Sequence, residues 1–255
     1  ICLLKLKREI FLKKIKFMLT IKKRRYKPLY KKFLKLKQNV QCRPRLLKFK
    51  KQKWNNLLTS LKRTQQSRYP FKVYDHHRYS LSMFSFKSNF RYKLHTKQRL
   101  SYFYGGLSQK YLKSIVRTAQ NKTKLKKKAI NSKFFLIEML ENRLDTVLYR
   151  SHFVPSIRSA RQLISHNHVS VNKKTVKNKS FILKKGDLVE VKPKAHFLIE
   201  NNVITSNIWP IPPKYLQINY RTFQIQLIKD IKSTNLSMHF PFWLDLNTLI
   251  KYYQR

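Results

Sequence analysis

Residues 156–166 carry apolar side chains at the spacing of a helix that buries one side. Ser156 comes just before this stripe, where its hydroxyl can accept a hydrogen bond from a first-turn amide. Asn167 follows it, at the position where a left-handed residue commonly ends a helix. The pattern predicts a short capped helix with an apolar stripe made by Ile157, Ala160, Leu163 and Ile164. Its other side is polar and cationic and carries Arg158, Arg161, Gln162 and Ser165.

Directly after Asn167 the apolar period changes from helical to alternate. Val169 and Val171 fall on one side of an extended chain, and His168 and Ser170 fall on the other. A turn is predicted at 185–187, followed by a strand that contains Leu188, Val189 and Val191. A helix is also predicted before residue 156, with an inward side made by Phe135, Leu136, Met139, Leu140, Leu144, Val147 and Leu148. Helix and strands together predict a compact unit with aliphatic side chains behind a cationic face.

Further elements are predicted on both sides of this unit. A helix is expected from Trp54 to Arg63, and two helices are expected over 95–119 with a break at 104–107, where glycines permit positive φ. Residues 64–93 show no clean period, and their aromatic side chains either stack on bases or, as we favour, hold an irregular segment in place. Two strands are expected in the tail, one with Leu216, Ile218 and Tyr220 and one with Phe223, Ile225 and Leu227.

The first part of the chain is strongly basic. Residues 1–37 alternate Leu, Ile and Phe with Lys, which fits an RNA-bound arm, a membrane-surface helix or a targeting presequence. We favour the RNA arm because of the positive charge that follows. Residues 38–53 are expected to form an extended strip along phosphates, with Arg43, Arg45, Lys48, Lys50 and Lys51. No apolar run approaches the roughly 18–20 residues that a membrane-spanning helix requires.

The overall charge strengthens the case for a polyanionic partner. The 255 residues include 58 Lys and Arg against 10 Asp and Glu, which gives a net charge of +48. Self-repulsion at this charge opposes a compact free state. Half of the acids lie between residues 138 and 190, which predicts internal ion pairs in that unit: Glu138, Glu141, Asp145, Asp187 and Glu190. A hydrophobic content of 42% still requires apolar cores.

Several groups of residues could suggest enzymatic or metal chemistry. Glu138 and Glu141 lie one helical turn apart, but surface or capping carboxylates that pair with nearby cations are the better interpretation. The triplets 75–77 and 166–168 each contain two histidines without further ligands at metal spacing. The two cysteines are far apart and predict free thiols. We expect no catalytic residues, no metal and no cofactor.

The run from Arg143 to Asn172 resembles a known RNA-binding module. The resemblance rests on Arg143-Leu144-Asp145, Tyr149-Arg150, the helix Ala160-Arg161-Gln162-Leu163-Ile164-Ser165-His166 with His168-Val169, and Lys185-Gly186-Asp187. This module is named after small-subunit ribosomal protein four and also occurs in other RNA-handling proteins. Two flanking segments, Lys97–Leu107 and Pro241–Leu246, resemble the ribosomal protein family itself. The likeness is good over 95–195, sparse in the tail and loose over 1–90.

The resemblance implies an α+β fold with an inserted RNA-binding module of the alpha-L type, a helix with a small antiparallel sheet. A basic arm would cover 1–90, a helical or mixed domain 91–131 and 197–255, and the module 132–196. The tail would then return to the helices of 90–130. The implied RNA-binding residues are Arg158, Arg161, Gln162, Ser165, His166, His168, Lys173, Lys174, Arg143, Arg150, Lys97, Arg99, Lys110, Arg43, Arg45, Lys48, Lys50 and Lys51.

The family resemblance also predicts a function. It implies a structural protein of the small ribosomal subunit that binds a multi-helix junction in the 5′ domain of the rRNA early in assembly. It further implies a place near the mRNA entrance, beside other small-subunit proteins. Few glycines and many Lys, Ile, Asn and Phe residues indicate an AT-rich gene, and we expect a mitochondrial protein. The alternative is an RNA-modifying enzyme, or its accessory, that uses the same module as an anchor.

Overall fold

The computed structural model describes residues 29–36, 40–41, 50–66, 86–125, 132–206, 211–228, 240, 242 and 245–253. The chain divides into two compact units. The first contains residues 1–39 and 43–64, and the second contains residues 40–42 and 65–255. Most of the arm predicted over residues 1–53 lies outside the described ranges, and so does most of the irregular segment 64–93.

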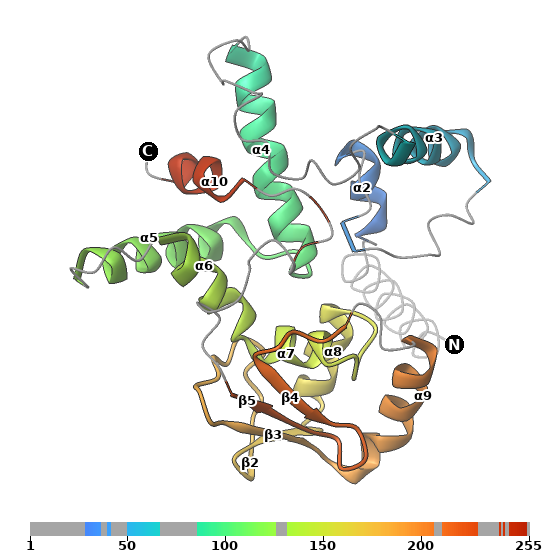
Figure 1. The fold of residues 1–255 in the computed structure, drawn as a ribbon, viewed down its shortest axis with the longest axis vertical. Helices are drawn as coiled ribbons and strands as arrows, with labels where there is room; N and C mark the ends of the chain where they lie inside the picture. The colour runs from blue at the N-terminus through green and yellow to red at the C-terminus, as the bar shows by residue number, and fades with distance from the viewer. Residues whose placement is uncertain are drawn as a thin grey trace, which may run out of the picture. The chain divides into compact units, whose positions relative to one another are not determined.

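The first unit contains two described helices (Figure 1). Helix α2, Tyr30–Leu36, buries Phe33 and Leu36, and helix α3, Gln52–Gln66, buries Trp54 and Leu57. The rings of Tyr30 and Trp54 lie 5.8 Å apart between their centroids. The helix predicted from Trp54 to Arg63 is therefore confirmed, and it extends a few residues past the predicted range at both ends.

The second unit contains the remaining helices. They are α4 Phe86–Phe103, α5 Gln109–Leu125, α6 Ser132–Glu141, α7 Leu144–Arg150, α8 Ile157–Ser165, α9 His196–Ser206 and α10 Leu246–Tyr253, with a short 3-10 turn at Pro193–Ala195. The two helices predicted over 95–119 are confirmed, and Gly105 and Gly106 have φ values of 74° and 83° in the turn between them. Helix α4 begins at Phe86, so the irregular segment predicted up to residue 93 is wrong for its last part. Helix α4 also packs against α10.

The second unit also contains a five-stranded sheet in the order β2-β1-β3-β5-β4, with all neighbours antiparallel. The strands are β1 Val169–Val171, β2 Lys174–Thr175, β3 Leu188–Val191, β4 Leu216–Asn219 and β5 Gln224–Leu227. Val189 pairs with Val171 on one side and with Ile225 on the other. The expected domain boundary at residue 196 therefore cuts through the sheet, because the tail hairpin β4–β5 completes it. Helices and antiparallel sheet together give the predicted α+β fold.

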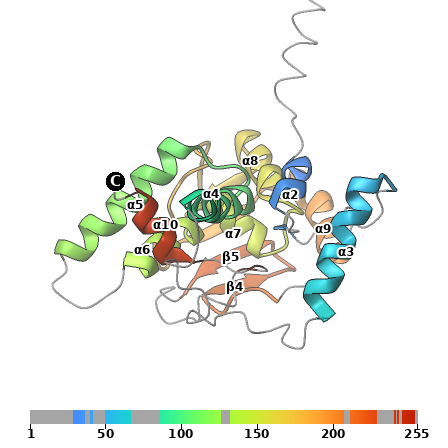
Figure 2. The same cartoon turned by 90° about the horizontal axis from the view of Figure 1, so that it is seen from above.

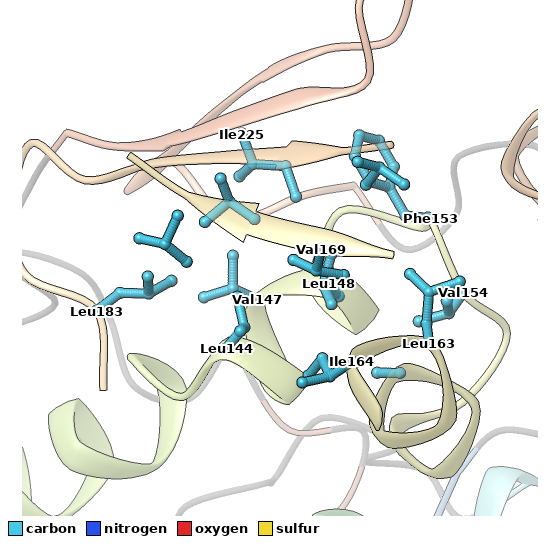
Figure 3. Packing of buried hydrophobic residues seen from close by; sticks show 14 of the residues in the cluster. Leu144, Val147, Leu148, Phe153, Val154, Leu163, Ile164, Val169, Leu183 and Ile225 are labelled. Carbon is cyan, nitrogen blue, oxygen red and sulfur yellow. The ribbon is translucent and has the colours of Figure 1, made fainter. Parts of the chain in front are cut away.

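Helices α7 and α8 pack against the sheet and enclose an aliphatic core (Figure 3). Val147 and Leu148 of α7 and Ile164 of α8 are fully buried beside Val169 of β1 and Ile225 of β5. Burying a side chain of this size contributes about 1.5–3 kcal/mol relative to leaving it exposed. This core holds α8 firmly, with one side turned away from the sheet.

The inward stripe of residues 135–148 belongs to two helices, whereas the sequence suggested one. At the break, the amide of Leu144 donates to the carbonyl of Phe181 at 2.9 Å, and that of Leu183 donates to the carbonyl of Asn142 at 2.8 Å. These bonds with a distant loop replace helical bonds at residues 142–143. They direct α7 toward the sheet while α6 remains packed on α5.

The C-terminal segment returns to the helices before the module. Helix α10 packs against α4, α5 and α6 (Figure 2). The ring of Phe103 in α4 lies 5.3 Å from Phe240 and 5.6 Å from Phe242, between centroids, in edge-on contacts. Among the described helices, each is too short or too polar to cross a lipid bilayer.

Candidate nucleic-acid interface

Helix α8 is fixed at both ends by local hydrogen bonds. The hydroxyl of Ser156 accepts from the amide of Ser159 at 3.2 Å, as predicted for the N-cap. At the other end Asn167 has a φ of 61°, and the amide of His168 donates to the carbonyl of Leu163 at 3.3 Å. This is the arrangement of a Schellman C-cap, in which a left-handed residue closes the last turn. The predicted stripe of α8 is buried throughout.

The outward side of α8 is polar and exposed. Arg158, Gln162, Ser165 and His166 are exposed, and His168 is half-buried at the start of the next strand. The rings of His166 and His168 lie 6.3 Å apart between their centroids. The Ser165 hydroxyl donates to the carbonyl of Arg161 at 2.7 Å, so its oxygen still offers acceptor capacity. Cationic, amide, hydroxyl and imidazole groups thus share one outward face, as the sequence predicted.

The hairpin between β1 and β2 presents two further predicted lysines. Asn172 and Lys173 both have positive φ, 49° and 66°, in a two-residue turn between the paired residues Val171 and Lys174. Two consecutive left-handed residues match the twist of the flanking strands. Lys173 and Lys174 are exposed there. The structure also shows exposed lysines that were not among the RNA-binding residues predicted from the sequence: Lys177, Lys179, Lys184 and Lys185.

Arg161 points into the protein, unlike its neighbours on α8. Its Nε donates to Asp145 at 2.7 Å, and its Nη atoms donate to the carbonyls of Tyr104 and Gly105 at 2.6 and 3.1 Å. Its guanidinium therefore holds the glycine turn against α8, and an RNA contact of Arg161 stays a prediction. Gly105 lets Arg161 come this close because it has no side chain. A Cβ at this position would lie 3.2 Å from Ile157 and 3.3 Å from Arg161.

Arg143 is also committed to an internal ion pair. Its Nε and Nη2 donate to both oxygens of Asp145 at 2.9 and 2.8 Å, and its side chain is 3% exposed. Burial lowers the pKa of Arg143, but the hydrogen bonds and the charge of Asp145 outweigh this and the pKa is raised overall. A guanidinium held in this way cannot reach a phosphate without breaking a buried pair. Arg143 therefore has a structural role, and its RNA contact stays a prediction.

Arg150 and Glu141 form a second buried ion pair. Arg150 donates to the two oxygens of Glu141 at 2.9 and 2.7 Å, and the same oxygens accept from Tyr104 at 2.6 Å and Tyr215 at 2.8 Å. Burial and the charge of Glu141 raise the pKa of both tyrosines well above the ordinary value. Arg150 is thus structural as well, and its RNA contact also stays a prediction.

The position of Glu141 corrects the expectation that it is a surface or capping carboxylate, because the residue is fully buried. A signal for this burial was available in the sequence. Glu141 stands at helical spacing with Ile137, Leu144 and Leu148, which are all buried. An acid inside an apolar stripe indicates a buried, paired carboxylate. The prediction of internal ion pairs in the module is confirmed.

The other predicted site residues are spread over both units. Lys97 donates to the Tyr252 hydroxyl at 3.1 Å, Arg99 is half-buried with a pKa lowered by burial, and Lys110 is exposed. Lys50 and Lys51 are exposed in the first unit. Arg43, Arg45 and Lys48 lie outside the described residues, as do the cysteines and the segment 75–77. Across the described ranges, no three His, Cys, Asp or Glu side chains come together as a metal site would require.

Comparisons with known proteins point to the same part of the chain. The family model described as the S4 domain matches residues 142–189, which contain α7, α8, the hairpin and the start of β3. Small ribosomal subunit protein uS4 of Pelagibacter ubique is 30% identical over 66% of this chain and 78% of its own length. Small ribosomal subunit protein uS4 of Rickettsia canadensis is 35% identical over 66% and 78%.

A further relative carries a different suffix in its name. Small ribosomal subunit protein uS4m of Reclinomonas americana is 33% identical over 63% of this chain and 64% of its own length. Each of these relatives aligns over 63–66% of this chain, which is far more than the stretch 142–189 matched by the S4 domain, so the likeness is not limited to that domain. The chain belongs to the uS4 family of small ribosomal subunit proteins.

Proposed function

We propose that this protein is a structural component of the small ribosomal subunit that binds its rRNA. The observation that carries the proposal is the arrangement within the matched S4 domain. The ion pair between Arg161 and Asp145 and an aliphatic core hold α8 in place, and the groups left exposed on α8 and on the β1–β2 hairpin are cationic or polar. We define the module face as Arg158, Gln162, Ser165, His166, His168, Lys173 and Lys174.

The module face and the basic arms have different tasks. A rigid set of donors and cations selects the position and orientation of the protein on folded RNA, because its members cannot rearrange freely. Many additional lysines and arginines neutralise phosphates and supply most of the salt-dependent affinity. The charge of +48 fits this division, since the module face accounts for only a small part of it.

The finer assignment extends the family relationship. The protein binds a multi-helix junction in the 5′ domain early in assembly, and it lies near the mRNA entrance beside other small-subunit proteins. The place of action is the mitochondrion. Two observations support this location: the residue usage of an AT-rich gene and the similarity to the uS4m protein of Reclinomonas americana.

The acids of the described residues give no specific support to an RNA-modifying enzyme. Glu141 and Asp145 are engaged by arginines, and Asp187 accepts from Asn172 and from the amide of Lys184. Asp245 accepts from the amide of Thr248 at the start of α10. These carboxylates have structural partners, whereas general acid–base chemistry requires a carboxylate that faces a substrate.

Crosslinking tests the proposal directly. Small subunits are isolated from the organelle after ultraviolet irradiation, and RNA fragments attached to this protein are sequenced. We expect fragments from one junction of the small-subunit rRNA, attached within residues 156–179. Binding of the purified chain to that fragment should weaken steeply with salt. A protein that sediments apart from the small subunit, or that crosslinks only to other RNA classes, would contradict the proposal.

A further inference from the structure

Helix α9 exposes three large apolar side chains. Phe197 is 77% exposed, Leu198 is 50% exposed and Ile204 is 66% exposed. Phe197 and Ile204 are seven positions apart, which places them on the same side of the helix, and Glu200 lies between them at helical spacing. We call Phe197, Glu200 and Ile204 the α9 face, and Leu198 lies at its edge, about 100° around the helix from Phe197. Three large apolar groups on one short helix are more than scattered surface exposure would give.

The opposite side of α9 is well anchored, so this exposure is not that of a loose helix. Ile199 is fully buried in the core beneath the sheet. The side-chain amide of Asn202 donates to the carbonyl of Phe153 at 3.1 Å. Just before the helix, a ring nitrogen of His196 lies 2.8 Å from the carbonyl of Val191 at the end of β3. The helix is thus fixed to the module, and Figure 1 shows it as an outlying helix at one end of the sheet.

The charge around α9 is unlike that of the rest of the chain. No lysine or arginine occurs between Lys194 and Lys214, although the chain has 58 of them in 255 residues. Glu200 adds a negative charge in the middle of the α9 face, where it is exposed. RNA affinity depends on lysines and arginines that neutralise phosphates, so RNA does not suit this surface. A second copy of the chain does not suit it either, because two bodies of charge +48 repel each other.

We propose that the α9 face is the docking surface for a neighbouring protein of the small subunit. The partner would present an apolar patch to Phe197 and Ile204, with Leu198 at its edge, and a lysine or arginine opposite Glu200. The neighbouring proteins of the small subunit bind RNA as well, so they carry lysines and arginines. One of these cations near Glu200 would complement its negative charge. This inference rests on the proposed function for the place of the protein, and it adds a specific contact surface.

A photoreactive side chain tests the contact in the assembled particle. Phe197 is replaced with p-benzoylphenylalanine in the full chain, and purified small subunits that contain it are irradiated. We expect one main adduct, with another protein of the small subunit. As a matched control, the same group at Lys173 should react with rRNA. An adduct of position 197 with rRNA, with this chain or with a second copy of it would overturn the proposal, and so would the lack of any adduct.

A pair of substitutions provides an independent measurement. Phe197→Asp with Ile204→Asp should leave rRNA affinity unchanged, while the crosslinked protein binds the particle about tenfold or more weakly, because buried apolar anchors dominate such interfaces. Ile182→Asp, at another exposed isoleucine, serves as the control and should retain the partner. If the double variant keeps the partner at wild-type occupancy, the proposal fails even though the rRNA-binding function stands. If the photoreactive group reacts with no component of the small subunit at either Phe197 or Lys173, the proposed function fails as well.

Discussion

The carboxylate of Glu141 accepts a buried hydrogen bond of 2.8 Å from the hydroxyl of Tyr215, although 74 residues separate the two in the chain. The same carboxylate accepts from Tyr104 at the end of α4 and from Arg150 at the end of α7. One acid therefore connects the helices before the module, the module itself and the strand hairpin of the tail. The orientation of α8 itself is fixed by the neighbouring pair of Arg161 with Asp145, at 2.7 Å.

Replacing Glu141 should destabilise the folded protein strongly. Glu141→Gln removes the negative charge that compensates the buried guanidinium of Arg150, and breaking such a pair costs about 3–5 kcal/mol. Urea unfolding followed by tryptophan fluorescence measures the loss. Glu200→Gln, an exposed acid on α9, is the matched control and should change stability by less than about 0.5 kcal/mol. Equal stability of the two variants would show that the Glu141 cluster is not structurally important.

The buried tyrosines predict a loss of stability at alkaline pH. The pKa values of Tyr104 and Tyr215 are raised in the folded protein, first by burial and then by the charge of Glu141. Above pH 10 the unfolded chain loses these protons while the folded chain keeps them, so the free energy of unfolding falls as pH rises. Below pH 10 both states keep the protons, and the full contribution is present.

The slope of stability against pH separates these tyrosines from the many lysines. Relative to a Tyr104→Phe, Tyr215→Phe double variant, the wild-type chain should lose about 1.4 kcal/mol per pH unit for each tyrosine above pH 10. The double variant is less stable at neutral pH because it lacks two hydrogen bonds, so the readout is the slope and not the midpoint at one pH. Parallel curves for the two proteins would refute the assignment.

Two glycines with positive φ should differ in their tolerance of alanine. Gly105→Ala places a methyl group 3.2 Å from Ile157 and 3.3 Å from Arg161, whereas a methyl group at Gly186 meets nothing within 4 Å. Both substitutions carry a left-handed strain of about 1–2 kcal/mol. Gly105→Ala should cost at least about 1 kcal/mol more, because the packing against α8 must also shift. Thermal unfolding of the two variants compares them, and a larger loss for Gly186→Ala would contradict this packing.

The module face should determine a measurable part of the salt dependence of RNA binding. Lys173→Ala with Lys174→Ala removes two exposed cations at the hairpin tip, and each lost phosphate contact lowers the slope of log affinity against log salt by about 0.7–0.9. Filter binding to the rRNA fragment over a range of salt concentrations gives this slope. An unchanged slope would mean that the hairpin does not face RNA.

Arg158 and Arg161 should differ in effect, although they lie three residues apart on α8. Arg158→Ala should weaken RNA binding and cost less unfolding free energy than Arg161→Ala, because Arg158 is exposed and its Nε donates to the carbonyl of Gly105 at the long distance of 3.5 Å. Arg161→Ala should mainly destabilise the fold, by about 1.5–3 kcal/mol for hydrogen bonds between charged groups. Paired measurements of binding and unfolding on both variants test this. Indistinguishable variants would contradict the inward orientation of Arg161.

The sequence by itself determined the local elements of the module and the nature of its partner. Ser156, the apolar stripe of α8 and Asn167 act within a few residues, so their effect is readable without the rest of the fold. The same is true of the alternation in β1 and β3, and the excess of positive charge follows from composition alone. Even the burial of Glu141 had a local signal, since it stands in register with buried apolar neighbours.

Only the tertiary structure decided which cations remain available outside. Arg143, Arg150 and Arg161 have the same side chain as Arg158, but acids and carbonyls distant in sequence hold them inward. The extension of the sheet by β4 and β5 and the exposure of α9 likewise depend on long-range packing. The periodicity of a helix shows which residues share a side, but the neighbours that cover each side are set by segments far along the chain.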